Sequence, residues 1–259
     1  MGEHYAEWSI FMTSFLLSLA GISIRVNALY ASTEQFCRSY LTSEPPLFSV
    51  TVRQQDIDLE RDRSAQEDAL EGIPVRQFRD PYLETLAVYR KIADRLLDYD
   101  VLLFHGSVVA VENRAFLFTA RSGVGKTTHT RLWLKNIPGA YVVNGDKPLL
   151  KVTGQGVIAC GSPWQGKENY GTNAQVPLQA VVLLERSPTN QIVPLEFAQA
   201  LPGLLQQSYR PQQTEGMLKS MELAGKLGQQ VALYRLGCNM EDEAASVAWN
   251  ALGAEEGIC

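Results

Sequence analysis

Cysteine and histidine are scarce in this chain of 259 residues. No Cys-x-x-Cys pair occurs, and the four cysteines are scattered as Cys37, Cys160, Cys238 and Cys259. Scattered thiols predict a reducing compartment and no disulfide framework, so we expect a cytoplasmic protein. With only three histidines (His4, His105 and His129) beside them, a zinc site is not expected.

The chain also lacks an excess of positive charge and a long uninterrupted apolar run. Lys and Arg total 23 against 28 Asp and Glu, a formal net charge of −5, which argues against nucleic acid as a partner. The apolar stretch 8–24 follows Glu3 and Glu7, where a signal peptide would carry basic residues, and polar residues interrupt it. We therefore predict no membrane segment.

With 46% hydrophobic and 20% charged residues, the composition is that of a globular protein with a core. Residues 1–80 are predicted to form a small β or α+β module, with strand-like runs at 21–26 and 47–53 and an acidic, polar connector at 54–71. Apolar residues recur at three- and four-residue steps over 81–100, which predicts a connecting helix.

Residues 101–259 are predicted to form the larger domain. Short β-rich runs stand at 101–104, 107–111, 115–119, 141–144, 149–152, 157–160, 180–185 and 230–236. Helical patterns follow at 196–205, 213–227 and 242–252. So many strands predict an α/β protein with a mixed or antiparallel sheet (an α+β mixed sheet), without strict alternation of strand and helix.

Residues 120–128 read Ala-Arg-Ser-Gly-Val-Gly-Lys-Thr-Thr, a phosphate-binding loop in which Ala120 replaces the first glycine. An apolar strand-like run precedes it, and a helical run closed by Pro138-Gly139 follows, as such a loop requires. Lys126 would reach the phosphate oxygens and Thr127 would hold Mg²⁺. The nucleotide-binding residues are predicted to be Ser122, Gly123, Val124, Gly125, Lys126, Thr127 and Thr128. The alternative is an ordinary glycine turn.

Two further residues follow apolar strands and are candidates for chemistry. Asp146, in Asn144-Gly145-Asp146, would face the phosphates from a strand end, although Asn-Gly-Asp is also a strong hairpin signal. His105 stands between two strands, where a lone histidine is more often structural than functional.

The polar segment 160–173 and a later arginine supply the remaining candidates. Lys167 and Glu168 would touch phosphate and metal respectively, or belong to a solvated loop anchored by Trp164. Arg210, just after a helix, would stabilise transferred phosphoryl charge, although a surface arginine is the commoner case.

Together these motifs resemble the catalytic domain of HPr kinase/phosphorylase, which shares its nucleotide-binding core with ATP-dependent phosphoenolpyruvate carboxykinase. The matching order is His105-Gly106, then Ser122 to Thr127, then Gly145-Asp146. The likeness extends to a kinase-like subgroup through the stretches 104–107, 128–133, 146–149, 161–167 and 234–239, covering roughly the last 160 residues. It does not reach the N-terminal module.

The resemblance implies a P-loop kinase core that uses ATP and Mg²⁺. It implies that His105 lies near the phosphates and that Asp146 serves metal binding and acceptor deprotonation, with Thr127 and Glu168 as further metal ligands. Gly145 stands where the family has its first aspartate, and 161–173 does not match the family's arginine-glycine signature. HPr itself is therefore not the expected substrate. Because HPr kinase is a hexamer, homo-oligomerisation stays open.

Three functions follow in order. The first is an ATP/Mg²⁺-dependent kinase acting on a hydroxyl of a protein, a peptide or a small molecule, with catalytic roles for Asp146, His105, Lys126 and Arg210. The second is an ATP-binding module without catalysis, acting as a sensor or assembly partner, because Ala120 and Gly145 depart from the pattern. The third is a carboxykinase-type enzyme.

Overall fold

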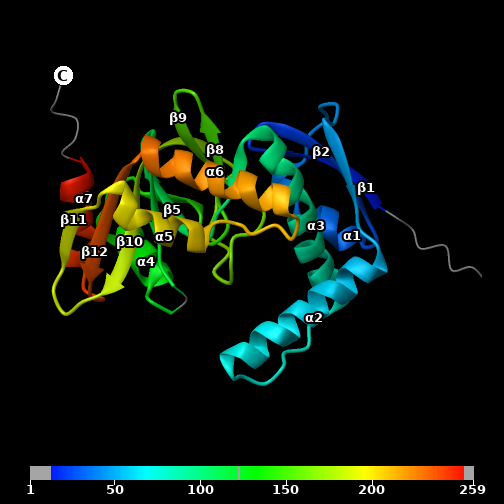
Figure 1. The fold of residues 1–259 in the computed structure, drawn as a ribbon, viewed down its shortest axis with the longest axis horizontal. Helices are drawn as coiled ribbons and strands as arrows, with labels where there is room; N and C mark the ends of the chain where they lie inside the picture. The colour runs from blue at the N-terminus through cyan, green and yellow to red at the C-terminus, as the bar shows by residue number, and fades with distance from the viewer. Residues whose placement is uncertain (1–12, 122, 254–259) are drawn as a thin grey trace, which may run out of the picture. The chain divides into compact units, whose positions relative to one another are not determined.

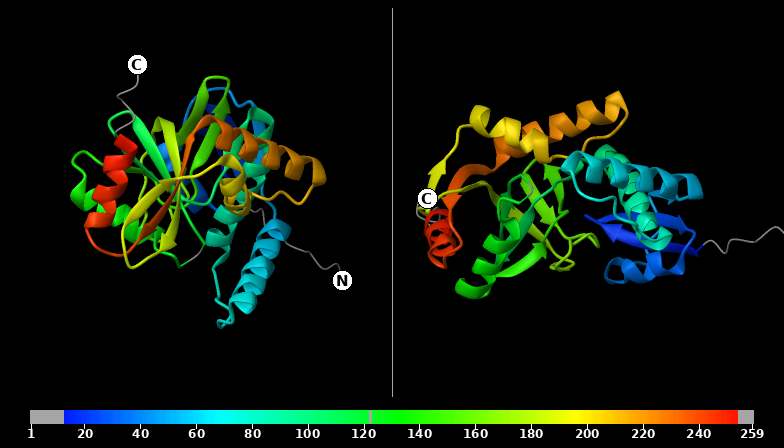
Figure 2. Two further views of the ribbon diagram at one scale, coloured as in Figure 1. Left: turned by 60° about the vertical axis from the view of Figure 1, so that its left-hand side comes forward. Right: turned by 90° about the horizontal axis from the view of Figure 1, so that it is seen from below.

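A computed structural model describes residues 13–121 and 123–253. The chain divides into two compact units, residues 1–92 and 93–259, and the division falls inside a helix. Each unit has its own buried core, and Figures 1 and 2 show the helices and strands of both. Among the described residues, no helix combines the length and the apolar character needed to cross a membrane.

The first unit contains a three-stranded sheet. Strand β1 (Thr13–Leu19) pairs antiparallel with β2 (Ile22–Ala28), and β2 pairs parallel with β3 (Phe48–Thr51). Between β2 and β3 lie helix α1 (Ala31–Phe36) and a 3-10 turn at Arg38–Tyr40. Buried and more exposed residues alternate along β1, as expected of a strand with one face on a core.

The predicted acidic connector at 54–71 is wrong, because Gln54–Glu71 forms the 18-residue helix α2. Its apolar residues do not gather on one face, so no helical period was visible in the sequence. The start and stop signals were present. Asp56 accepts a hydrogen bond from the Arg53 amide at the first turn, and Gly72 ends the helix at φ +69°.

Helix α2 is fixed by buried carboxylates in place of an apolar stripe. Glu60 is 3% exposed and accepts hydrogen bonds from Arg90 on helix α3 (Asp80–Leu96), at 2.7 and 2.9 Å, and from Arg63. Asp68 is buried and accepts hydrogen bonds from the guanidinium and the amide of Arg76. Burying a charged group is costly unless hydrogen bonds and an opposite charge compensate it, and both carboxylates have such partners.

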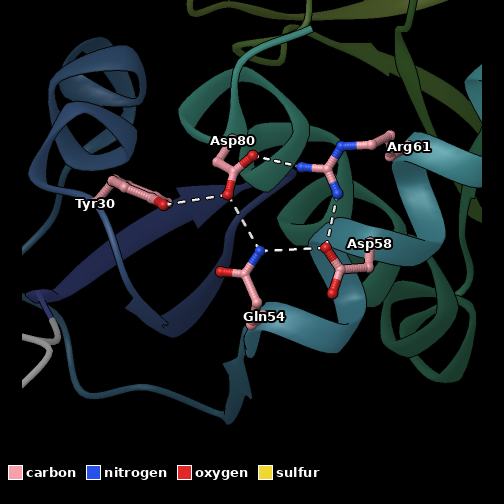
Figure 3. Close-up of polar contacts among 5 residues, drawn as sticks. All are labelled: Tyr30, Gln54, Asp58, Arg61 and Asp80. Carbon is pink, nitrogen blue, oxygen red and sulfur yellow. Dashed lines mark hydrogen bonds and ion pairs between the residues drawn. The ribbon is translucent and has the colours of Figure 1, made fainter.

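A second polar cluster joins the start of α2 to the start of α3 (Figure 3). Arg61 bridges Asp58 and Asp80, and Gln54 donates to the same two carboxylates. The Tyr30 hydroxyl donates to Asp80 from the other side. These side chains are partly or largely exposed, so this cluster orients the two helices more than it stabilises them.

The described part of the second unit forms a nine-stranded mixed sheet. Its strands are β4 (Val101–Leu103), β5 (Ser107–Val111), β6 (Arg114–Thr119), β7 (Tyr141–Asn144), β8 (Leu149–Thr153), β9 (Gly156–Cys160), β10 (Gln175–Arg186), β11 (Gln191–Pro194) and β12 (Ala232–Cys238). The order is β4-β8-β9-β10-β6-β5-β7, with β12 beside β10 and β11 beside β12. Strand β10 runs parallel to β6 and β12, and the other pairs are antiparallel. The predicted mixed sheet is confirmed.

Helices cover both faces of this sheet, as Figure 2 shows. Helices α5 (Phe197–Gln207) and α6 (Thr214–Gln230) pack on one face, over a core that includes Leu117, Val181 and Leu223. Helices α4 (Lys126–Asn136) and α7 (Glu243–Gly253) pack on the other face. A 3-10 turn at Leu97–Tyr99 leads from α3 into β4.

Glu84 on α3 is a third buried carboxylate of the first unit that accepts three hydrogen bonds, and it yields a stability prediction. It is fully buried and accepts hydrogen bonds from the Leu29 and Tyr30 amides, at 2.5 and 3.1 Å, and from the Thr33 hydroxyl. In Glu84→Ala these donors stay buried without their acceptor, so we expect the free energy of unfolding to fall by about 3 kcal/mol.

The measurement is urea denaturation followed by circular dichroism. The matched control is Glu67→Ala, the same change at an exposed position of α2, which we expect to shift stability by less than about 0.5 kcal/mol. Equal midpoints for the two variants would contradict the role given to Glu84.

Candidate nucleotide-binding site

The phosphate-loop sequence lies between a buried strand and a helix, as predicted. Strand β6 ends at Thr119 and α4 begins at Lys126. In the loop, Gly123 and Gly125 have φ of +77° and +128°, values that disfavour any other residue. A Cβ atom built on either glycine meets no heavy atom within 4 Å, so the space beside the loop is open. Gly125 provides no side-chain cap for α4, which leaves the first amides of the helix for a ligand.

Ala120 fits this loop without strain. Its φ is not among the positive ones, so the position does not require glycine. Its side chain is 9% exposed and belongs to the same core cluster as Phe118 and Trp133. The replacement of the first glycine therefore leaves the loop conformation intact. Ser122, predicted to contact phosphate, lies outside the described residues.

An aromatic cluster fixes helix α4 against the sheet. His129 is 2% exposed, packs on Phe118 at 4.6 Å between ring centres, and accepts a hydrogen bond from the Trp133 indole at 3.0 Å. Burial lowers the pKa of His129 to about 4, so the imidazole is neutral at pH 7. Trp133 in turn meets Trp249 of α7 edge to face. The N-terminus of α4 is held in place by this packing.

Two side chains fasten the loop itself. The Lys126 ammonium donates to the Ala120 carbonyl at 3.1 Å, across the loop. The Arg186 guanidinium donates to the Gly123 carbonyl at 2.5 Å, from the carboxyl end of β10. Since β10 runs parallel to β6, Arg186 reaches the loop from the edge of the sheet where ligands of α/β proteins bind. Sequence reasoning missed Arg186, whose only signal was its position at the end of a buried strand.

Asn144 organises the turn that carries Asp146. It ends β7, is fully buried, and its side-chain oxygen accepts hydrogen bonds from the Asp146 and Lys147 amides at 2.9 and 2.6 Å. Its side-chain nitrogen donates to Ser162 and to the Trp164 carbonyl at 3.0 to 3.3 Å. The Asn-Gly-Asp sequence makes no hairpin here, because β7 pairs with β5 and β8 pairs with β4 and β9.

His105 lies against Asp146. Its Nε2 is 3.5 Å from Asp146 Oδ1, and the neighbouring Gly106 amide donates to the Asp146 carbonyl at 3.1 Å. The His105 amide donates to the Gln207 carbonyl at 2.8 Å, and its imidazole also bonds to the Gln207 side chain. The pair predicted from sequence, His105 and Asp146, is therefore in one place.

Two lysines complete this cluster. Burial, followed by the charges of Lys147 and Lys126, lowers the pKa of His105 to about 4, with Asp146 and Gln207 opposing the shift. Burial also lowers the pKa of Lys126, while Asp146 raises it and Lys147 lowers it further. The imidazole is neutral at pH 7, and the charges of both lysines act on it. Lys147 was not among the predicted site residues, although it follows Asp146 directly.

The loop 161–173 approaches Asp146 through Gly166. A Cβ atom on Gly166 would lie 2.9 Å from the Asp146 Cβ, and Trp164 anchors the loop at 7% exposure. Glu168 forms an ion pair with Arg131 at 2.6 Å, and Arg131 stands one turn after Thr127 on α4. Thr127, Lys167 and Glu168 are exposed. The metal role of Glu168 stays a prediction.

Arg210 lies just after helix α5, as predicted. Its guanidinium donates to the Gln206 carbonyl at 3.3 Å, and the residue lines a pocket between α5 and α6. The role of Arg210 in stabilising transferred charge stays a prediction.

The donor set suits Mg²⁺ held jointly with phosphates. The described residues contain no cluster of three His, Cys, Asp or Glu side chains that would form an all-protein metal site. Mg²⁺ is commonly held by one or two carboxylates together with substrate phosphates, and Asp146 and Thr127 offer oxygen donors of that kind.

Gly145 is constrained by its surroundings, which generates a prediction. A Cβ atom there would meet the Gln165 and Tyr170 carbonyl oxygens at 3.2 Å and the Tyr170 Cβ at 3.3 Å. Gly145→Ala therefore displaces the loop 161–173, and we expect a loss of about 1–3 kcal/mol of stability in thermal denaturation.

The control is Gly154→Ala, because a Cβ at Gly154 meets nothing within 4 Å. We expect its melting temperature to stay close to that of the unmodified protein. If the two variants melt alike, the packing around Gly145 is not what excludes a side chain there.

No protein-family model and no curated protein sequence matches this chain. Among solved structures it is similar to the HPr(Ser) kinase/phosphatase from Coxiella burnetii, with a TM-score of 0.35 and 10% sequence identity. That likeness covers 60% of this chain and 99% of the other. It is weak, and it assigns neither a function nor site residues to this chain.

Proposed function

We propose that this protein is an ATP/Mg²⁺-dependent phosphotransferase that acts on a hydroxyl group. One observation carries the proposal: His105 Nε2 lies 3.5 Å from Asp146 Oδ1, and the charges of Lys126 and Lys147 act on this histidine, beside an open glycine loop at the start of a helix. Loop amides and a helix N-terminus bind anions, and neighbouring ammonium groups add to that attraction.

Each residue of the proposed site has its own role in binding or transfer. The loop amides and Lys126 bind the phosphates, while Thr127 and Asp146 hold Mg²⁺, which neutralises phosphate charge when bound. Asp146, with the neutral His105 at 3.5 Å, accepts the proton of the incoming hydroxyl. Lys147 stabilises the transferred charge. Phosphoryl transfer depends mainly on positioning and electrostatics, and this cluster supplies both.

A second function, nucleotide binding without transfer, is favoured by the single carboxylate of the cluster. The acceptor base and the metal ligand fall on the same Asp146, because Gly145 has no side chain and Glu168 is paired with Arg131. In that case the protein acts as an ATP-dependent sensor or assembly partner.

Nucleotide binding is tested by calorimetry with ATP and Mg²⁺. We expect Lys126→Ala to weaken binding about 100-fold, because it removes the charge-assisted contact to the phosphates. The control is Lys135→Ala on the same helix, where the lysine is exposed and pairs with Asp242, and we expect unchanged affinity. Absence of Mg²⁺-dependent binding by the unmodified protein would overturn both functions.

Phosphoryl transfer is tested by ADP release with serine-containing peptides. We expect Asp146→Asn to retain ATP affinity within about tenfold and to lose transfer by at least about 100-fold, since the amide cannot accept the hydroxyl proton. Tight ATP binding by the unmodified protein with no transfer to any acceptor would favour the binding module over the kinase.

A further inference from the structure

We infer that the pocket between helices α5 and α6 binds an apolar side chain of a peptide whose hydroxyl group is presented to Asp146. This inference rests on the proposed function and names its acceptor class. The pocket has a volume of about 250 Å³, and its walls include Pro202, Leu205, Met217, Met221 and Arg210. Figure 1 shows the two helices side by side.

The pocket adjoins the proposed catalytic centre through one short segment. Gln207 bonds to His105 through both its backbone carbonyl and its side chain. Its two neighbours, Gln206 and Ser208, both line the pocket. Consecutive Cα atoms are about 3.8 Å apart, so the rim of the pocket lies within roughly two residue spacings of the group that touches His105.

Hydrogen bonds hold the segment 206–209 in place. The Tyr209 amide donates to the Leu103 carbonyl at 2.9 Å, and Ser208 forms an isolated β-bridge with Phe104, the residue before His105. From helix α6, the Ser220 hydroxyl donates to the Tyr209 carbonyl at 2.5 Å. These hydrogen bonds fix the position of the pocket relative to His105, as a specificity subsite needs.

The chemistry of the walls selects the ligand. Two methionines, a leucine and a proline form an apolar surface, and methionine adapts to side chains of varied shape. The aliphatic stem of Arg210 can extend that surface, since its guanidinium is engaged by the Gln206 carbonyl. The pocket therefore favours an uncharged aliphatic side chain.

The size of the pocket favours a side chain over a whole molecule. Pockets for complete small-molecule ligands measure about 300–1,000 Å³, more than this one offers. A ligand that fills the pocket and also reaches Asp146 must be extended over several ångströms. An extended peptide advances about 3.3 Å per residue, so a side chain one or two residues from the acceptor spans this separation.

The test measures peptide binding without turnover, by fluorescence anisotropy in the presence of ATP and Mg²⁺ on the full chain carrying Asp146→Asn. Four nine-residue peptides have a central serine with leucine one or two positions before or after it. A fifth has glutamine in place of leucine. We expect at least one leucine peptide to bind about tenfold more tightly than the glutamine peptide.

The pocket is then blocked in that background. Met221→Trp fills it and Met221→Glu charges it, and both are expected to abolish the preference for leucine; Met221 is 47% exposed, so the helix tolerates either change. The matched control is Leu218→Trp on the same helix, 63% exposed and not part of the pocket wall, which should keep the preference.

Equal affinity for all five peptides, no binding of any, or a preference that survives both Met221 variants would overturn the inference. Affinity for ATP and Mg²⁺ is measured on the Met221 and Leu218 variants and should equal that of the Asp146→Asn background. Failure of the proposed function would show as absent ATP binding, whereas failure of the pocket alone would leave ATP binding intact and remove only the peptide preference.

Discussion

The buried carboxamide of Asn144 is the interaction on which the rest of the candidate site depends. Its oxygen holds the turn that carries Asp146 and Lys147, and its nitrogen holds the loop that covers them. A carboxylate of the same shape could not serve, because it has no donors for the loop carbonyls. A buried amide that satisfies both sides fixes the position of Asp146 more rigidly than two exposed loops could.

That turn also determines the electrostatics of the site. It places Lys147 close enough to lower the pKa values of both His105 and Lys126, which burial already lowers. Two ammonium groups, one carboxylate and a neutral imidazole leave the cluster with a net positive charge in a chain whose overall charge is −5. The positive charge is therefore a property of this local arrangement and does not follow from composition.

Local patterns predicted much of the fold, and contacts between distant segments explain what they missed. Apolar runs located β5 and β7 at their observed bounds, because buried strands need continuous apolar residues. They failed for α2, whose buried contacts are charged. In the candidate site, motifs indicated His105 and Asp146. They did not indicate Arg186 or Gln207, because the partners of these two residues, Gly123 and His105, are far from them in the sequence.

The departure at Ala120, in the phosphate loop, and the departure at Gly145, beside Asp146, have different physical meanings. Ala120 occupies a position that needs no positive φ and adds a methyl group to the core, so it costs the loop nothing. Gly145 is closely packed, because a Cβ atom there would lie 3.2 to 3.3 Å from atoms of Gln165 and Tyr170, which would have to shift to admit it. The absence of a side chain at Gly145 and the packing of the loop 161–173 therefore go together. A site with one carboxylate under a packed loop is a consistent structure, and an aspartate placed at position 145 without other changes would displace that loop.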